Sequence, residues 1–100
     1  MTRHTVVRYT VRPGAEVRNI ELVRAVYREL AELAPAGFRY ATYRLDAGRT
    51  FVHVAVSEGA NPLPGLTAFR AFQGAIDERC EWGPVVSEAE EIGAFAIDPA

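Results

Sequence analysis

The 100-residue sequence contains no lysine and a single cysteine, and these absences exclude several kinds of chemistry. All eleven basic residues are arginine, so a lysine Schiff base and a lysine general base are both excluded. Cys80 has no second cysteine with which to form an internal disulfide. The two histidines and the cysteine show no spacing typical of a metal site. We therefore expect no metal ion and no cofactor.

A signal-peptide pattern, a long apolar run and an excess of positive charge are missing too. Without an apolar stretch of roughly 18 residues, no membrane span is expected. The formal net charge of -2 and the pI near 5.6 argue against nonspecific binding to nucleic acid or to an anionic membrane. A hydrophobic content of 49% with 24% charged residues is typical of a folded domain. We expect one cytoplasmic domain over residues 1–100.

The spacing of apolar residues predicts four strands and two helices. Alternation with a period of two predicts strands, and recurrence at three- and four-residue steps predicts helices. In chain order these are a strand over Thr5–Val11, a helix over Glu16–Ala34, strands over Phe38–Leu45 and Thr50–Ser57, a helix over Leu66–Glu81 that "EWGP" ends, and a last strand mainly over Glu91–Ile97. The order β-α-β-β-α-β indicates a ferredoxin-like α+β fold, a four-stranded antiparallel sheet with both helices on one face.

The central hairpin sorts its side chains into two faces. If "DAGR" is a four-residue connection, Thr42 lies opposite His53 and Tyr40 lies opposite Ala55. One face is then almost wholly apolar, and we expect the helices to cover it together with Val7, Tyr9 and Val11 of the first strand. The members of this face are Ala41, Tyr43, Leu45, Val52, Val54 and Val56.

The opposite face of the hairpin is mixed and would be left open. It carries Phe38, Tyr40, Phe51 and His53. An exposed apolar patch of this size needs cover, and hiding it at about 25 cal/mol per Å² would contribute several kcal/mol before the costs of association. We therefore expect a homodimer formed through the open sheet face, with His53 in the interface.

A small-molecule site is predicted between the helices and the sheet. Tyr9, Tyr27 and Tyr43 project toward this layer, and Asn19 lies on the inner stripe of the first helix. Phenols and an amide against an apolar wall would bind and polarise a planar aromatic ligand, so the three tyrosines are candidate substrate-binding residues. Asn19, Tyr43 and His53 are the candidate catalytic residues, with His53 as a proton acceptor oriented by Thr42. The alternative is that all of these side chains serve packing alone, with Asn19 at a helix start.

A second hypothesis for the third strand is that it binds nucleic acid. "RTFVHVAV" loosely resembles a strand of the RNA-recognition motif, with Phe51 and His53 at the stacking positions. Thr50 stands in place of the usual glycine and Val56 in place of the final aromatic residue. Because the chain is acidic, stacking would have no electrostatic attraction to support it, and we expect no nucleic-acid partner.

Three stretches together resemble the dimeric α+β barrel superfamily, and especially the antibiotic-biosynthesis-monooxygenase-like proteins. They are "HTVVRYTVRPG" leading into "NIELVRAVYREL", the hairpin "YRLDAGRTFVHVAVSE", and "LTAFRAFQGAIDERC". The resemblance implies oxidation of phenols to quinones without metal or flavin, or heme degradation. Active members are similar in using Asn and Trp. Here Trp82 follows the second predicted helix, and neither Asn19 nor Asn61 stands beside it, so this pattern is not carried over.

Two functions follow from the sequence and the resemblance. The first is a cofactor-independent monooxygenase-like enzyme acting on an aromatic or polyketide-like small molecule. The second is a noncatalytic homodimeric module of the same fold that binds a ligand or partner. A cavity of a few hundred Å³ between helices and sheet would favour the enzyme, and a solid layer would favour the module.

Overall fold

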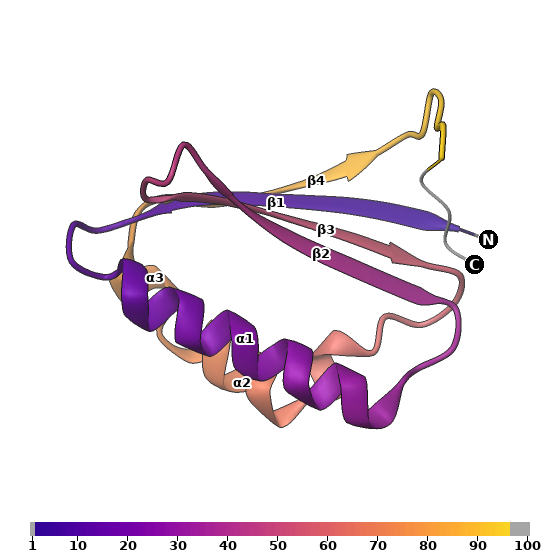
Figure 1. Cartoon of the computed structure of the whole chain (residues 1–100), viewed down its shortest axis with the longest axis horizontal. Coiled ribbons are helices and arrows are strands. Elements are labelled where there is room, and N and C mark those ends of the chain that lie inside the picture. Colours follow the sequence, from indigo (N-terminus) through magenta and orange to yellow (C-terminus); the bar gives the residue numbers. More distant parts are fainter. Residues whose placement is uncertain (1, 97–100) are drawn as a thin grey trace.

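The computed structural model describes residues 2–96 and has the predicted ferredoxin-like topology (Figure 1). Four strands form one antiparallel sheet in the order β2-β3-β1-β4. In chain order the elements are β1 (Arg3–Val11), α1 (Glu16–Leu33), β2 (Phe38–Leu45), β3 (Thr50–Ser57), the short 3-10 turn η1 (Leu63–Gly65), α2 (Thr67–Gly74), α3 (Ile76–Arg79) and β4 (Cys80–Ala89).

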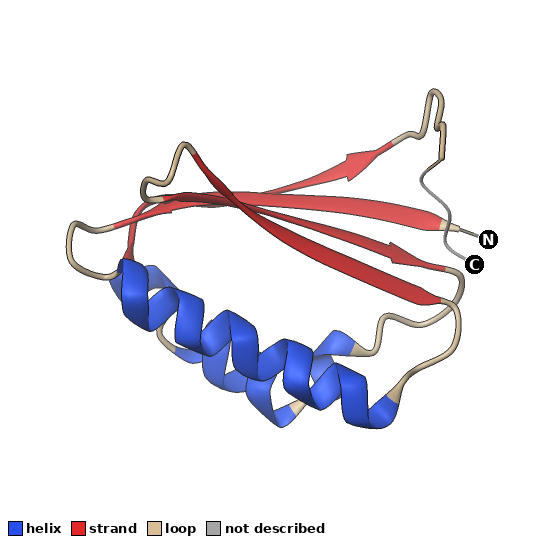
Figure 2. Cartoon of the chain, viewed as in Figure 1, coloured by secondary structure: helices blue, strands red, loops and turns tan. Residues whose placement is uncertain are grey.

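The helices cover one face of the sheet and leave the other face open (Figure 2). α1 and α2 lie side by side beneath the strands. The core lies between these layers, where Tyr9, Val11 and Phe51 of the sheet pack against Val26 and Phe72 of the helices. No helix among the described residues is long and apolar enough to cross a membrane.

The predicted register of the central hairpin is confirmed. Thr42 pairs with His53, and Tyr40 pairs with Ala55. The connection over residues 46–49 is the predicted four-residue turn, and it places Asp46 and Ala47 in the left-handed region, with φ of 54° and 49°. Paired residues point to the same face, so the two predicted sets of side chains stay separate.

The prediction of which hairpin face the helices cover is wrong. Val7 pairs with His53 and Tyr9 pairs with Phe51, so the inner residues of β1 share a face with the mixed set of the hairpin. Phe51 is only 2% exposed and His53 only 4%, beneath the helices. The aliphatic set therefore lies on the open face. There it includes Tyr43, which is 57% exposed.

The last third of the chain also departs from the prediction. The second helix was expected to run unbroken over Leu66–Glu81, whereas it divides at Ala75 into α2 and α3. The final strand was expected at Glu91–Ile97, whereas β4 covers Cys80–Ala89; Ile97 lies outside the described residues. "EWGP" was expected to end the second helix, whereas the helix ends at Arg79 and "EWGP" lies within β4. An edge strand tolerates Pro84, because one side of its backbone pairs with no neighbour.

Gly83 is the residue that lets β4 approach β1 at this point. Its φ is +81°, and a Cβ there would lie 2.8 Å from the carbonyl oxygen of Arg8 and 3.1 Å from Cα of Tyr9. A side chain at this position would push β4 away from the backbone that holds Tyr9. Sequence reasoning took this glycine as a breaker, although it serves a close contact between two strands.

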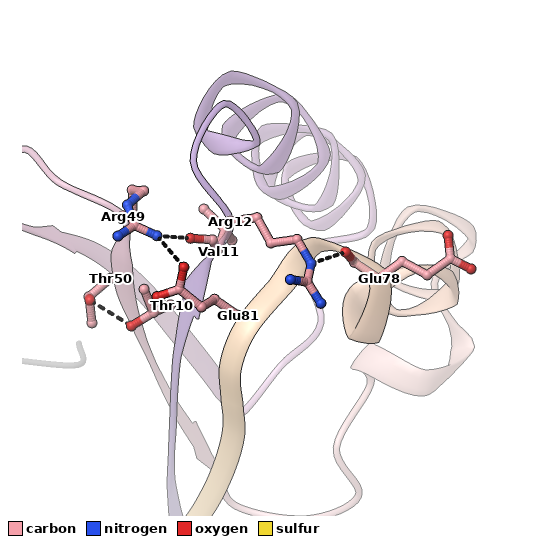
Figure 3. A network of polar contacts seen from close by, with 7 residues as sticks. All are labelled: Thr10, Val11, Arg12, Arg49, Thr50, Glu78 and Glu81. Atoms are coloured by element: carbon pink, nitrogen blue, oxygen red, sulfur yellow. Dashed lines mark hydrogen bonds and ion pairs between the residues drawn. The ribbon is translucent and has the colours of Figure 1, made fainter.

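Polar contacts join the ends of β1, β3, α3 and β4 (Figure 3). Arg49 donates from Nη1 to the carbonyl oxygen of Val11 at 2.7 Å and to Glu81 Oε1 at 3.2 Å. Arg12 donates from Nε to the carbonyl oxygen of Glu78 at 3.0 Å. These contacts fix the short α3 helix, and with it Arg79 at its end, against the sheet.

Replacing Gly83 by alanine should destabilise the fold by roughly 1–3 kcal/mol, because both the positive φ and the contact with Arg8 disfavour a Cβ. Chemical denaturation measures the loss. Gly59→Ala is the matched control: nothing lies within 4 Å of its Cβ position, and a change below about 0.5 kcal/mol is expected. Equal losses in both variants would contradict the close approach.

Candidate functional site

A chain of hydrogen-bonded polar side chains crosses the buried face of the sheet. Each of these side chains is hydrogen-bonded to at least one other member of the series. The members come from α1, α3 and three strands. No buried side-chain nitrogen or oxygen in the part of the protein that the structure describes lacks a partner. In order of contact, the members run from Arg79 through Asn19 and Tyr9 to His53, which contacts both Tyr40 and Thr42; Thr42 also contacts Tyr27.

His53 lies at the centre of this chain, and both of its ring nitrogens are engaged. Nε2 lies 2.7 Å from the hydroxyl oxygen of Tyr9. Nδ1 lies 2.6 Å from the hydroxyl oxygen of Tyr40 and 3.2 Å from Oγ1 of Thr42. Because these contacts use both nitrogens, a ligand reaches the imidazole only through one of the neighbouring hydroxyl groups.

One end of the chain is a buried arginine. Arg79 is 8% exposed and donates from Nε to Asn19 Oδ1 at 3.2 Å and from Nη2 to the carbonyl oxygen of Phe72 at 2.7 Å. Its guanidinium also lies over the ring of Phe72, 5.2 Å from the centroid. Among residues 2–96, no carboxylate lies within ion-pair distance of it. Neutral amide and carbonyl groups therefore solvate this cation.

The other end of the chain reaches the α1 side of the sheet edge. The Tyr27 hydroxyl lies 2.7 Å from Thr42 Oγ1, and either oxygen can be the donor. The ring of Tyr27 stacks on that of Tyr40 with centroids 5.2 Å apart. This stacking holds the Tyr40 ring and so places its hydroxyl group against His53.

Burial shifts the ionisation of the central groups. Desolvation lowers the pKa of His53 from 6.5 to about 4, so the imidazole is neutral at pH 7. Desolvation raises the pKa of Tyr9 and Tyr40 well above the usual value for a phenol. It lowers the pKa of the Arg79 guanidinium. The site therefore holds neutral hydrogen-bonding groups beside a single buried cation.

A cavity of about 280 Å³ opens beside this chain, between the sheet and the segment that contains η1 and α2. Its walls are largely apolar, and the residues on the sheet side include His53 and Tyr40. A cavity of this size is the outcome that the sequence analysis took as favouring the enzyme over the noncatalytic module. The lining residues are Thr5, Val7, Tyr40, His53, Ala55, Asn61, Leu63, Pro64, Phe69, Phe72, Gln73, Ile76, Pro84 and Val86.

The five predicted site residues fall in three places. Tyr9 and Asn19 are fully buried behind His53, which alone of the five lines the cavity. Tyr27 lies at the far end of the hydrogen-bonded chain. Tyr43 was predicted to lie between helices and sheet, and that placement is wrong because the residue is exposed on the open face. Alternation along β2 puts Tyr43 on the face opposite Tyr40 and Thr42.

Tyr40 is the functional residue that sequence reasoning missed. It shares a face with His53 in the predicted register, and that pairing was the available signal. The error came from the choice of the covered face, which left Tyr40 on the outside of the protein. In the structure Tyr40 packs against the core and lines the cavity.

The residues that line this cavity include no tryptophan and no metal-binding cluster. Among residues 2–96, no group of three or more His, Cys, Asp or Glu side chains could hold a metal ion. Trp82 lies on β4, 48% exposed, with the Arg8 guanidinium 5.6 Å from its ring centroid, and it does not line the cavity. Asn61 does line the cavity, and its Oδ1 accepts the backbone N–H of Leu63 at 2.9 Å.

Comparison with solved structures finds the same arrangement of elements in other proteins. Rv0793 from Mycobacterium tuberculosis aligns with a TM-score of 0.75 and 17% identity, over 94% of this chain and 98% of its own. A protein from Chloroflexus aurantiacus assigned to the antibiotic biosynthesis monooxygenases aligns with a TM-score of 0.70 and 10% identity, over 98% and 100%. The chain shares the ferredoxin-like α+β fold of these proteins. The sequence resembles the antibiotic-biosynthesis-monooxygenase-like proteins, and this fold is the one that the resemblance implies.

A cofactor-independent oxygenase shares this monooxygenase-like fold. SnoaB from Streptomyces nogalater, in a variant with one asparagine replaced by alanine, aligns with a TM-score of 0.67 and 17% identity, over 95% of this chain and 97% of its own. No family model matches the sequence, and a search of curated proteins finds no match. At these identities the likeness establishes the fold, and the chemistry has to be argued from the cavity.

The buried neutral His53 makes stability depend on pH. Unfolding returns its pKa to about 6.5, so the unfolded chain takes up a proton that the folded chain excludes down to about pH 4. Stability is therefore full above about pH 6.5 and falls as the pH drops toward 4, by about 3 kcal/mol at about 1.4 kcal/mol per pKa unit. Chemical denaturation of the wild type and His53→Gln at a series of pH values measures this.

The test compares how strongly the stability of the wild type and of His53→Gln depends on pH. The carboxylates titrate in both proteins, so their contribution cancels in the difference. His53→Gln keeps a polar side chain but cannot titrate, so its stability should fall less between pH 7 and 4.5. Parallel pH profiles for the two proteins would show that His53 is not held neutral in the folded state.

Proposed function

We propose that the protein is a cofactor-independent monooxygenase-like enzyme that oxidises an aromatic or polyketide-like small molecule in the cavity beside His53. The observation that carries this proposal is Tyr40, a residue of the cavity wall whose hydroxyl oxygen lies 2.6 Å from Nδ1 of the buried His53. An apolar cavity of about 280 Å³ with few convergent polar groups is typical of a site for a ring-containing ligand. The shared fold with SnoaB agrees with this chemistry.

In this proposal the substrate itself supplies the electrons that reduce dioxygen. For an anthrone, the ring methylene loses a proton to give an enolate, the enolate reacts with dioxygen at that carbon, and loss of water leaves the quinone. The atoms balance as one anthrone and one dioxygen giving one anthraquinone and one water. The protein's part is to bind the planar ring against the apolar wall that contains Phe69 and Phe72 and to hold its oxygen at Tyr40.

The geometry favours a supporting role for His53 over the proton acceptor predicted from the sequence. Both nitrogens already have hydroxyl partners, and a pKa near 4 makes the imidazole a weak base at pH 7. His53 then acts through Tyr40, and the substrate's proton leaves to water at the mouth of the cavity. Tyr9 and Asn19 act one step further back, behind His53. That the protein works in the cytoplasm stays a prediction from the sequence.

We also propose that the protein is a homodimer joined through the open sheet face, although with other residues than the sequence analysis assigned to that face. The exposed face of the hairpin is mostly apolar and joins Trp82 and Val85 of β4, which are 48% and 46% exposed. The chain after β4 lies on this same side of the sheet in Figure 1 and carries the exposed Ile92 and Phe95. A second copy would cover this surface.

Tyr40→Phe should lower the turnover of an anthrone substrate by about 10²-fold, because the phenyl ring keeps the packing and removes the hydroxyl group from the cavity wall. Oxygen uptake and quinone absorbance measure turnover. Tyr43→Phe makes the same change on the open face, and so distinguishes the site at Tyr40 from the site at Tyr43 that the sequence predicted. A loss confined to Tyr43→Phe would overturn the site proposed here, and ligand binding without any oxygen uptake would favour the noncatalytic module.

Val54→Glu should convert the dimer to a monomer, because it places a charge at the centre of the apolar open face, where burial without a partner costs several kcal/mol. Sedimentation equilibrium measures the mass. Val17→Glu is the matched control: Val17 is 68% exposed on α1, away from this face, and its variant should keep the wild-type mass. A monomeric wild type at micromolar concentration would exclude this interface.

A further inference from the structure

Along the buried series of hydrogen bonds, each group has a fixed role as donor or acceptor, and Arg79 determines these roles. A guanidinium only donates, so the Asn19 atom that faces Arg79 Nε at 3.2 Å is an acceptor, namely Oδ1. The Asn19 amide nitrogen therefore faces the hydroxyl oxygen of Tyr9, to which it donates at 2.9 Å. The amide has no freedom to turn over, because reversal would set two donors against each other at Arg79.

The donor role of Asn19 also determines which atom donates in the next hydrogen bond, between Tyr9 and His53. The Tyr9 oxygen already accepts from Asn19, and its remaining neighbour in the chain is His53 Nε2 at 2.7 Å. The Tyr9 hydroxyl therefore donates to Nε2. A neutral imidazole has one donor and one acceptor nitrogen, so with Nε2 accepting, the hydrogen is on Nδ1.

The hydrogen on Nδ1 determines which group Tyr40 offers to the cavity. Nδ1–H donates to the Tyr40 oxygen at 2.6 Å, with Thr42 Oγ1 at 3.2 Å as a weaker second acceptor. Tyr40 then has its own hydroxyl hydrogen to donate, either to Thr42 beside it or to a ligand in the cavity that Tyr40 lines. The group that the sheet presents to a ligand is thus a hydrogen-bond donor, and Asn19, Tyr9 and His53 connect it to the buried charge of Arg79.

We propose that Arg79 is a positioning residue that, through Asn19 and Tyr9, fixes His53 as the Nδ1–H tautomer and turns the Tyr40 hydroxyl hydrogen toward the cavity. The site then selects a ligand whose oxygen accepts a hydrogen bond at Tyr40, which is a ring ketone or an enolate. This inference deepens the proposed function and rests on it for the ligand class. The tautomer itself depends on no activity.

Asn19→Asp tests the direction with a nearly isosteric change. A carboxylate still accepts from Arg79, and it also accepts from Tyr9, so the Tyr9 hydrogen turns from His53 toward residue 19. Tyr9 then accepts from Nε2–H, and Nδ1 accepts from Tyr40. The variant therefore reverses every bond from Tyr9 to Tyr40 while keeping the buried side chains, and the new charge lies beside Arg79.

Long-range proton–nitrogen NMR spectra of histidine-labelled protein at pH 7 read the tautomer directly, and His4→Gln assigns the two rings. We expect the hydrogen of His53 on Nδ1 in the wild type and on Nε2 in Asn19→Asp. Asn61→Asp makes the same change at the cavity but outside the chain, and should leave the wild-type tautomer. An Nε2–H wild type, or an unchanged tautomer in Asn19→Asp, overturns the proposal. If Asn19→Asp does not fold, the wild-type spectrum still shows which nitrogen of His53 carries the hydrogen, and so still tests the proposal.

A matched pair of bicyclic probes tests the consequence for binding. 1-Tetralone has one acceptor oxygen and no donor, whereas tetralin has neither. We expect wild-type protein to bind the ketone about three- to tenfold more tightly than tetralin, as measured by NMR titration. Tyr40→Phe and Asn19→Asp should both reduce that preference to below about twofold. Undiminished preference in Asn19→Asp overturns the proposal, whereas absent oxygen uptake with this result intact refutes the proposed enzyme alone.

Discussion

The structure depends on a set of buried polar groups that satisfy one another beneath the sheet. Left unpaired, each buried hydroxyl, amide or imidazole would cost about 1–3 kcal/mol, and the uncompensated guanidinium of Arg79 would cost more. Their partners come from α1, α3, β1, β2 and β3, so the groups are satisfied only when all five elements are in register. The strand pairing that places Val7 opposite His53 is therefore also the pairing that closes this network.

This network explains why the helices cover the less hydrophobic face of the hairpin. Counting apolar residues favours burying Val52, Val54 and Val56, and sequence reasoning made that choice. The count treats Tyr40 and His53 as costly to bury, which holds only while they lack partners. His53 and Tyr40 are partners of each other, and Tyr9 on β1 is the second partner of His53. Asn19 and Tyr27 on α1 bond Tyr9 and Thr42 in turn, and a one-dimensional pattern does not show that these side chains meet.

Short-range features were predictable, and long-range ones were less so. The first strand, the first helix and the hairpin follow from local periodicity, and the register follows from the length of one turn. β4 was misplaced because its pairing partner, β1, lies far earlier in the chain, and no local pattern reports the approach of Gly83 to Arg8. The apolar stretch after Glu91 looked more like a strand, yet in the structure Ile92 is 87% exposed.

The alternation of β3 connects the site to the proposed subunit contact. His53 stands between Val52 and Val54, whose side chains point to the opposite face, so the strand that carries the imidazole is also the centre of the surface that a second copy would cover. The hydrogen-bonded chain lies entirely within one subunit, and assembly adds no group to it. A partner would instead stiffen β3 from behind. Since His53 and Tyr40 meet across β2 and β3, a shift of either strand by a fraction of an ångström would lengthen the 2.6 Å contact that orders the cavity wall.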